Sequence, residues 1–166
     1  MNTELNKAMS TALGFERKGH DIYEDTANST KNPIVAKTFS YLADQEHFHI
    51  AEIQTYIKSQ KIEFLGDRQE ATQQFFATTV KEFKLRTKLS ETDLKAHETA
   101  LELEKHAYHF YLEQFNKTKD PELKQFFEFI MKQEKIHYEL VKRAYEYIQD
   151  PVAFYQKSED ALFEGW

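Results

Sequence analysis

Two short segments of the sequence each place a glutamate and a histidine three residues apart. These are Glu46 with His49, and Glu134 with His137 a further 88 residues along the chain. On an α-helix, residues three apart share one face, so each pair can present a carboxylate and an imidazole together. Such groups are suited to binding one side of a metal centre. A single Glu-x-x-His in so Glu- and His-rich a chain is close to chance, so its recurrence is the informative feature.

The repetition extends well beyond these two pairs. Shifting the chain by 88 residues aligns its two halves without a gap, which indicates two related helix hairpins. The other matched positions are Glu16 and Glu104, Tyr23 and Tyr111, Asn28 and Asn116, Pro33 and Pro121, Phe39 and Phe127, and Gln45 and Gln133.

The spacing also places the glutamates of each hairpin at one level. Glu16 and Glu46 lie symmetrically about Lys31, in the break between two expected helices. Each is therefore about 15 residues, or roughly 22 Å of helix, from the turn. Glu104 and Glu134 have the same relation in the second half. If the two hairpins face each other, four glutamates and two histidines share one layer.

A layer of four carboxylates in a helical core needs compensating positive charge. Buried carboxylates are very unfavourable when they are unpaired, and no lysine or arginine occupies the same stripe at that level. Two divalent or trivalent cations would compensate, and such a set of oxygen and nitrogen ligands suits iron or manganese. One glutamate from each of two helices, with Glu-x-x-His from the other two, is the known ligand set of ferritin-like di-iron bundles.

Composition favours an all-helical protein. The 166 residues include only 4 Gly and 3 Pro, with 40% apolar and 30% charged residues, which fits one helical domain with a sizeable core. The net charge of −6 argues against a nucleic-acid partner. The absence of cysteine excludes thiolate metal sites and disulfides within this sequence. No signal-like start or long apolar run is present, so we expect a cytoplasmic protein without membrane contact.

Helical periodicity and helix-start signals divide the chain. The start signals are Asn32-Pro33, the capping-box sequence from Ser90 to Asp93, and Asp120-Pro121, while Asp150-Pro151 ends the last long helix. A connection as long as that between the two hairpins favours a crossover with its own helix, at about 68–88, after an irregular stretch at 61–67. The long helices are expected at about 3–30, 33–59, 90–118 and 121–149.

The predicted fold is an all-α, ferritin-like antiparallel four-helix bundle with one long crossover. It comprises residues 1–150, with hairpins at 3–60 and 90–149 joined by the crossover at 61–89. The tail at 151–166 is too apolar for a solvated extension, so we expect it to dock on the bundle or on a partner chain.

Over residues 5–147, apart from the crossover, the sequence resembles the rubrerythrin branch of the ferritin-like di-iron proteins. The segments that carry the resemblance are 16–23, 44–49, 104–111 and 133–137. Tyr23 and Tyr111 resemble the tyrosines that hydrogen-bond to ligand carboxylates in that family. The metal ligands that the resemblance implies are Glu16, Glu46, His49, Glu104, Glu134 and His137.

The resemblance implies two iron ions, with manganese or a mixed pair as alternatives. Glu46 and Glu134 would bridge the ions, and Glu16 and Glu104 would be terminal ligands. It implies a homodimer that reduces hydrogen peroxide or dioxygen with an external electron donor, since the sequence lacks the four cysteines of a rubredoxin domain. Rubrerythrins also carry an extra glutamate one turn after the ligand of the third helix, where this chain has Ala107.

Two other functions fit the same residues. The centre could be a ferroxidase in iron storage or handling, or the bundle could be a non-enzymatic module that the metal stabilises. The remaining histidines lack the repeat relation and are expected to be surface or structural residues, although His20 lies one turn from Glu16. They are His20, His47, His97, His106 and His109.

Overall fold

The computed structural model describes residues 3–59, 68–82 and 89–164, with side chains described over 5–59, 68–82 and 89–157. The irregular stretch expected at 61–67 and the end of the expected crossover helix, 83–88, lie outside this part of the chain. Within it, the backbone forms helices and no strands. The helices are α1 (Thr3–Ser29), α2 (Pro33–Ser59), α3 (Gln69–Glu82), α4 (Glu91–Lys117), α5 (Pro121–Gln149) and α6 (Pro151–Glu164).

The expected start signals are present at the beginnings of three long helices. Asn32 Oδ1 accepts hydrogen bonds from two backbone N–H groups in the first turn of α2, at 3.0 and 3.3 Å. Ser90 and Asp93 form a reciprocal capping box at α4. Asp120 caps α5 in the same way as Asn32 caps α2. The hydroxyl of Thr30 also donates a 2.5 Å hydrogen bond to Asp93, which ties the first hairpin turn to the start of α4.

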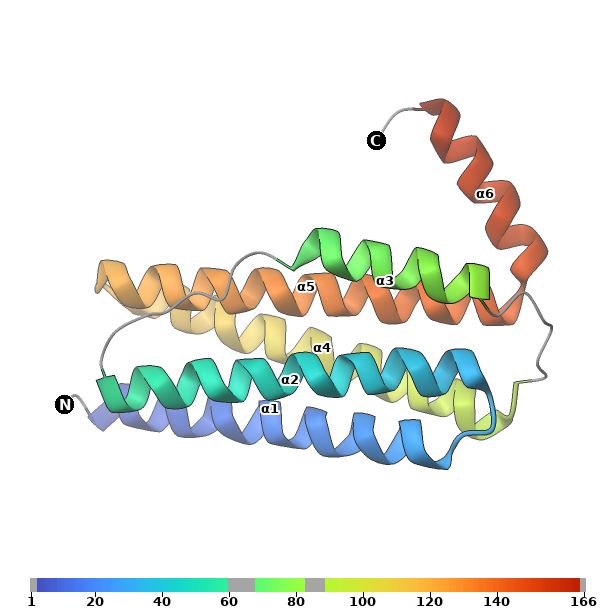
Figure 1. Cartoon of the computed structure of the whole chain (residues 1–166). Coiled ribbons are helices and arrows are strands. Elements are labelled where there is room, and N and C mark those ends of the chain that lie inside the picture. Colours follow the sequence, from blue (N-terminus) through green and yellow to red (C-terminus); the bar gives the residue numbers. More distant parts are fainter. Residues whose placement is uncertain (1–2, 60–67, 83–88, 165–166) are drawn as a thin grey trace.

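The four long helices form an antiparallel bundle (Figure 1). α1 packs along α2, and α4 packs along α5, so each half of the repeat is a helix hairpin. The hairpins meet through contacts of α1 with α4 and of α2 with α5. The prediction of an all-α, ferritin-like bundle is therefore confirmed.

Two shorter helices accompany the bundle. α3, in the crossover, lies along α5 and also contacts α2 (Figure 1). α6 leaves the end of α5 and points away from the bundle. Near its start, Phe154 packs against Phe76 of α3 and Tyr147 of α5, with ring centroids 5.8 and 5.4 Å apart. Docking of the rest of the tail remains a prediction, because its side chains from residue 158 lie outside the described part.

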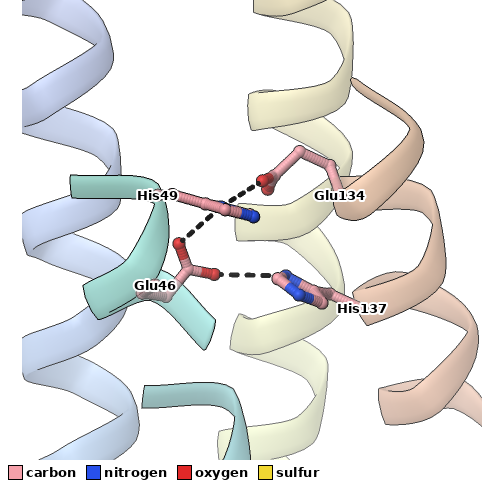
Figure 2. A group of neighbouring side chains, drawn as sticks. All are labelled: Glu46, His49, Glu134 and His137. Carbon is pink, nitrogen blue, oxygen red and sulfur yellow. Dashed lines mark ion pairs between the residues drawn. The ribbon is translucent and has the colours of Figure 1, made fainter. Parts of the chain in front are cut away.

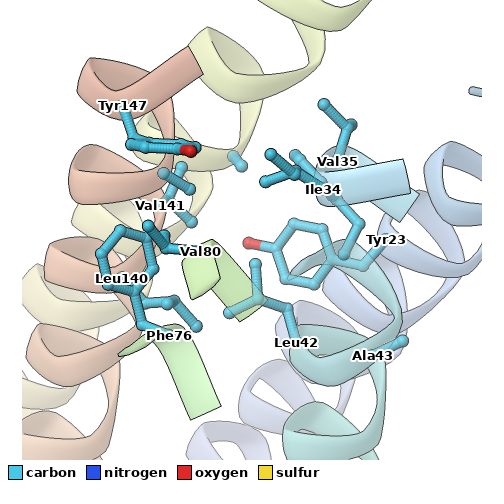
Figure 3. Close-up of a cluster of buried hydrophobic side chains, with 13 residues drawn as sticks. Tyr23, Ile34, Val35, Leu42, Ala43, Phe76, Val80, Leu140, Val141 and Tyr147 are labelled. Atoms are coloured by element: carbon cyan, nitrogen blue, oxygen red, sulfur yellow. The ribbon is translucent and has the colours of Figure 1, made fainter. Parts of the chain in front are cut away.

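Two apolar clusters fill the bundle, one toward each end. The first includes Val35 and Leu42 of α2, Leu140 of α5, and Phe76 and Val80 of α3 (Figure 3). Burial of each such large side chain contributes about 1.5–3 kcal/mol. The second cluster lies toward the turn between α4 and α5. Its large members include Met9, Ile53, Tyr56, Tyr111, Phe126, Phe127 and Ile130.

The order of these clusters along the helices locates the space between them. On α2, residues 34–43 belong to the first cluster and residues 53–56 to the second. On α5 the order is reversed, with residues 123–130 in the second cluster and 140–147 in the first. The Glu-x-x-His pairs at 46–49 and 134–137 fall between them on both helices, with apolar packing on either side. None of the described helices combines the length and apolar character needed to cross a bilayer.

Candidate metal centre

All six predicted ligand residues lie inside the bundle between the two apolar clusters. Glu16 comes from α1, Glu104 from α4, and each Glu-x-x-His pair from α2 or α5. None of the six is more than 3% exposed. We call the six residues the metal layer; they are Glu16, Glu46, His49, Glu104, Glu134 and His137.

The two Glu-x-x-His pairs meet at the centre of the metal layer (Figure 2). One ligand atom from each of Glu46, His49, Glu134 and His137 can be chosen so that all lie within 4.8 Å of one another. Nδ1 of His49 is 3.1 Å from Glu134 Oε1, and Nδ1 of His137 is 3.4 Å from Glu46 Oε1. Each imidazole thus faces the central carboxylate of the opposite hairpin, and the two rings stack with centroids 5.1 Å apart.

Glu16 and Glu104 flank this central group. Oε2 of Glu16 lies 3.0 Å from Nδ1 of His49, and Oε2 of Glu104 lies 3.6 Å from Nδ1 of His137. Each outer carboxylate therefore contacts the histidine of its own hairpin. The structure thus brings all six predicted residues to one level, with two glutamates central and two at the sides.

Each outer carboxylate also accepts a hydrogen bond from a tyrosine of the other hairpin. The hydroxyl of Tyr23 donates to Glu104 Oε1 at 2.5 Å, and the hydroxyl of Tyr111 donates to Glu16 Oε1. Both tyrosines are almost completely buried. The two bonds cross between the hairpins and hold one oxygen of each outer glutamate, leaving the other oxygen directed at a histidine.

The metal layer carries more negative than positive charge. In the described part of the chain, every ion pair of its four carboxylates is with His49 or His137, and none is with a lysine or arginine. Even two fully protonated imidazoles would balance only half of four carboxylates. Moreover, Nδ1 of His137 and Oε2 of Glu104 are buried without a hydrogen-bond partner among the residues that the structure describes. Such groups are unfavourable in a core unless something else binds them.

The pKa directions reflect this shortage of cations. Burial and the nearby Glu46 carboxylate raise the pKa of Glu16 to about 8. Burial, with the other carboxylates, raises the pKa of Glu134 well above its usual range. Burial acts to lower the pKa of His137, but the nearby Glu104 and Glu46 carboxylates outweigh it and raise that pKa to about 9. Without metal, the layer therefore retains protons to reduce its negative charge.

The donor set of the metal layer fits two cations of the iron or manganese type. Carboxylate oxygens and imidazole nitrogens are the ligands these ions take in helical bundles. Bound cations would supply the missing positive charge and would bind Nδ1 of His137 and Oε2 of Glu104, which lack a hydrogen bond within the described residues. The residues present are therefore suited to the group that the fold implies.

A third carboxylate of α2 was not foreseen from the sequence. Glu52 is buried one turn beyond His49, and its Oε1 lies 3.9 Å from Nη2 of Arg68. Arg68 also donates to Gln45 Oε1 at 3.3 Å, and its guanidinium lies 4.0 Å from the ring centre of Phe48. Position in the apolar stripe of α2 is the signal that could have indicated Glu52. The repeat could not, because its counterpart is a leucine.

The five other histidines lie outside the metal layer. His97 is fully buried, with Nδ1 2.7 Å from the backbone carbonyl of Asp93 and its ring edge-on to Phe39. His106 and His109 are exposed on α4. His47 is exposed on α2 and His20 is partly exposed on α1, and these two rings approach each other.

Comparison with known proteins identifies a family for most of the chain. The family model described as Rubrerythrin matches residues 7–145. No curated protein and no solved structure matches the chain. The matched range contains the four long helices almost completely and all six residues of the metal layer.

Proposed function

Because this chain belongs to the rubrerythrin family, we propose that its metal layer holds two iron ions and reduces hydrogen peroxide or dioxygen. The observation that carries the proposal is the convergence of four buried glutamates and two buried histidines without a lysine or arginine among their described ion-pair partners. A layer of this composition is stable in a core when cations occupy it.

The residues of the layer have separate roles in this proposal. Glu46 and Glu134, which lie at the centre of the layer, would hold the ions from the middle, while Glu16 and Glu104 would hold them from the two sides. Bound iron would supply the electrons for the reduction by cycling between its ferrous and ferric states.

The surroundings of the layer hold the ligands and limit the access of water. The crossed hydrogen bonds from Tyr23 and Tyr111 fix the orientation of the outer carboxylates. The apolar clusters on either side keep bulk water from the charged groups, which strengthens their interactions with a cation. We propose that electrons arrive from a donor outside these 166 residues, because they contain no cysteine for an iron–thiolate centre. A homodimer remains part of the proposal.

The test combines metal content with turnover. Protein purified without added metal is analysed for iron and manganese, then supplied with a chemical reductant and hydrogen peroxide or oxygen. We expect close to two iron ions per chain and consumption of the oxidant over many turnovers. His137→Ala should lose most of the metal and the activity, because it removes one of two imidazole ligands. His106→Ala, which changes an exposed histidine of α4, should retain both.

Three results would contradict the proposal. Full iron loading in His137→Ala would show that the metal layer is not the iron site. Iron loading with one turnover and growing ferric mineral would instead indicate ferroxidase activity. Loading with neither reaction would leave the metal a structural role.

A further inference from the structure

Two histidines of the first hairpin form a pair at its surface. His20 of α1 and His47 of α2 have ring centroids 6.2 Å apart, with their planes inclined by 50°. His47 is exposed and His20 is partly exposed, so the pair is accessible to solvent. The counterparts in the repeat are Tyr108 and Lys135, so the second hairpin has no such pair.

The geometry of the pair suits a single metal ion. Because metal–nitrogen bonds are about 2.0–2.1 Å long, two imidazoles that share one tetrahedral ion have ring centres roughly 5 Å apart. A rotation of the exposed His47 side chain that closes the 6.2 Å separation by about 1 Å would bring both rings to one ion. Nδ1 of His20 also lies 3.2 Å from Oδ1 of Asp21. A carboxylate bound to one ring nitrogen orients the imidazole and leaves the lone pair on the other nitrogen, as is usual for histidines that bind metals.

The residues that precede these two histidines touch each other at the metal layer. Gly19 precedes His20, and Glu46 precedes His47. A Cβ atom at Gly19 would lie 3.5 Å from both Cγ and Cδ of Glu46. At this point the backbone of α1, rather than a side chain, lies against the central carboxylate. On both helices, the histidine of the surface pair therefore directly follows a residue of the contact between Gly19 and Glu46.

We propose that His20 and His47 bind one divalent transition-metal ion at the surface and pass it to the metal layer beside Gly19. This inference rests on the proposed function, which provides the destination of the ion. Imidazole is a ligand for ferrous iron, cobalt and zinc, and its affinity rises from ferrous iron to cobalt. Two histidines leave the remaining coordination positions to water, so an ion held there can exchange its ligands and be released.

Equilibrium dialysis against Co²⁺ alone tests the surface site. In a His137→Ala background, in which the layer is incomplete, adding His47→Ala should remove one further Co²⁺ ion per chain. Adding His106→Ala, the matched change of an exposed histidine on α4, should remove none. If the His47→Ala double variant binds as much Co²⁺ as the His137→Ala parent, the surface site does not exist.

The rate of loading tests the transfer. In the otherwise unchanged chain, His20→Ala or His47→Ala should slow loading of the layer with Co²⁺ by about tenfold or more, because the local concentration of the ion falls. The final loading should not change, since neither residue belongs to the layer. An unaltered rate would overturn the transfer role. A chain without substitutions that takes no Co²⁺ or iron into the layer would instead contradict the proposed function, whatever the surface pair binds.

Discussion

The two hairpins are equivalent within the metal layer and differ immediately outside it. Each provides one outer glutamate, one Glu-x-x-His pair and one tyrosine that bonds across to the other hairpin. One turn beyond the histidines, however, α2 has Glu52 and α5 has Leu140. The comparison indicates that the two hairpins have the same residues where both must hold the buried charges of the layer. At the flanking positions, the residue type is instead determined by the side chains around it.

The neighbours of Glu52 and Leu140 explain this difference. Arg68, immediately before α3, lies beside Glu52 and offers its carboxylate a positive charge. Leu140 belongs to the apolar cluster that includes Phe76 and Val80 of α3. The crossover helix contacts both α2 and α5, but it presents a charge to one and apolar side chains to the other. It therefore removes the symmetry of the two hairpins at these two flanking positions, which lie on opposite sides of the metal layer.

The largest effect is expected when each hairpin receives the residue of the other at this position. Leu140→Glu should lower the free energy of unfolding by about 3–5 kcal/mol, because it buries a carboxylate among apolar groups. Glu52→Leu should change it by no more than about 1 kcal/mol, since Arg68 is partly exposed and keeps its contacts with Gln45 and Phe48. Urea unfolding of both variants provides the measurement. Equal destabilisation would show that the neighbours do not determine the difference.

The crossed tyrosines test the equivalence inside the layer. Tyr23→Phe and Tyr111→Phe each remove a hydrogen bond to one outer carboxylate. Both should weaken metal binding by a similar factor, roughly 10–100-fold, as is typical when a group that orients a ligand is lost. Competition with a chelator of known affinity measures the change. Tyr108→Phe, in a tyrosine of α4 whose ring contacts His109, serves as the control. A large effect of one variant alone would mean that the two halves of the centre are not equivalent.

The smallest effect concerns His97, whose counterpart in the first hairpin is Met9. Burial lowers the pKa of His97 from 6.5, although its contact with the Asp93 backbone opposes the shift. The unfolded chain therefore binds a proton at this residue more readily than the folded chain, and stability falls as pH drops below about 6.5.

His97→Met should remove this contribution and flatten the stability profile between neutral and mildly acidic pH. The change in slope is at most about 1.4 kcal/mol per pH unit, the value for one proton. Thermal or urea unfolding across that range, compared with His106→Ala, gives the result. An unchanged slope would mean that another group causes the acid sensitivity.

Much of the fold follows from local signals in the sequence. The caps at Asn32, Ser90 and Asp120 start helices where predicted, because a side-chain oxygen can satisfy backbone N–H groups only at a helix start. The repeat indicated which glutamates and histidines share a level, since helix rise is constant. The structure places these residues together; their binding of iron remains a proposal.

Other features were not accessible from spacing alone. That Tyr23 bonds to Glu104, rather than to a carboxylate of its own hairpin, depends on how α1 and α4 pack. The contact between His20 and His47 likewise depends on the relative rotation of α1 and α2. Glu52 lacks a counterpart in the repeat, so a search for symmetry passes over it. Such relations are set by tertiary packing, which periodicity does not specify.

The crossed tyrosine bonds have a consequence for the order of events during synthesis. They join residues 81 and 95 positions apart in the chain, so neither can form until most of the protein has been made. The first hairpin to leave the ribosome has only one histidine and two glutamates of the six residues of the metal layer. Under the proposed function, a nascent chain would therefore bind iron poorly, and tight binding would begin once the second hairpin has packed against the first.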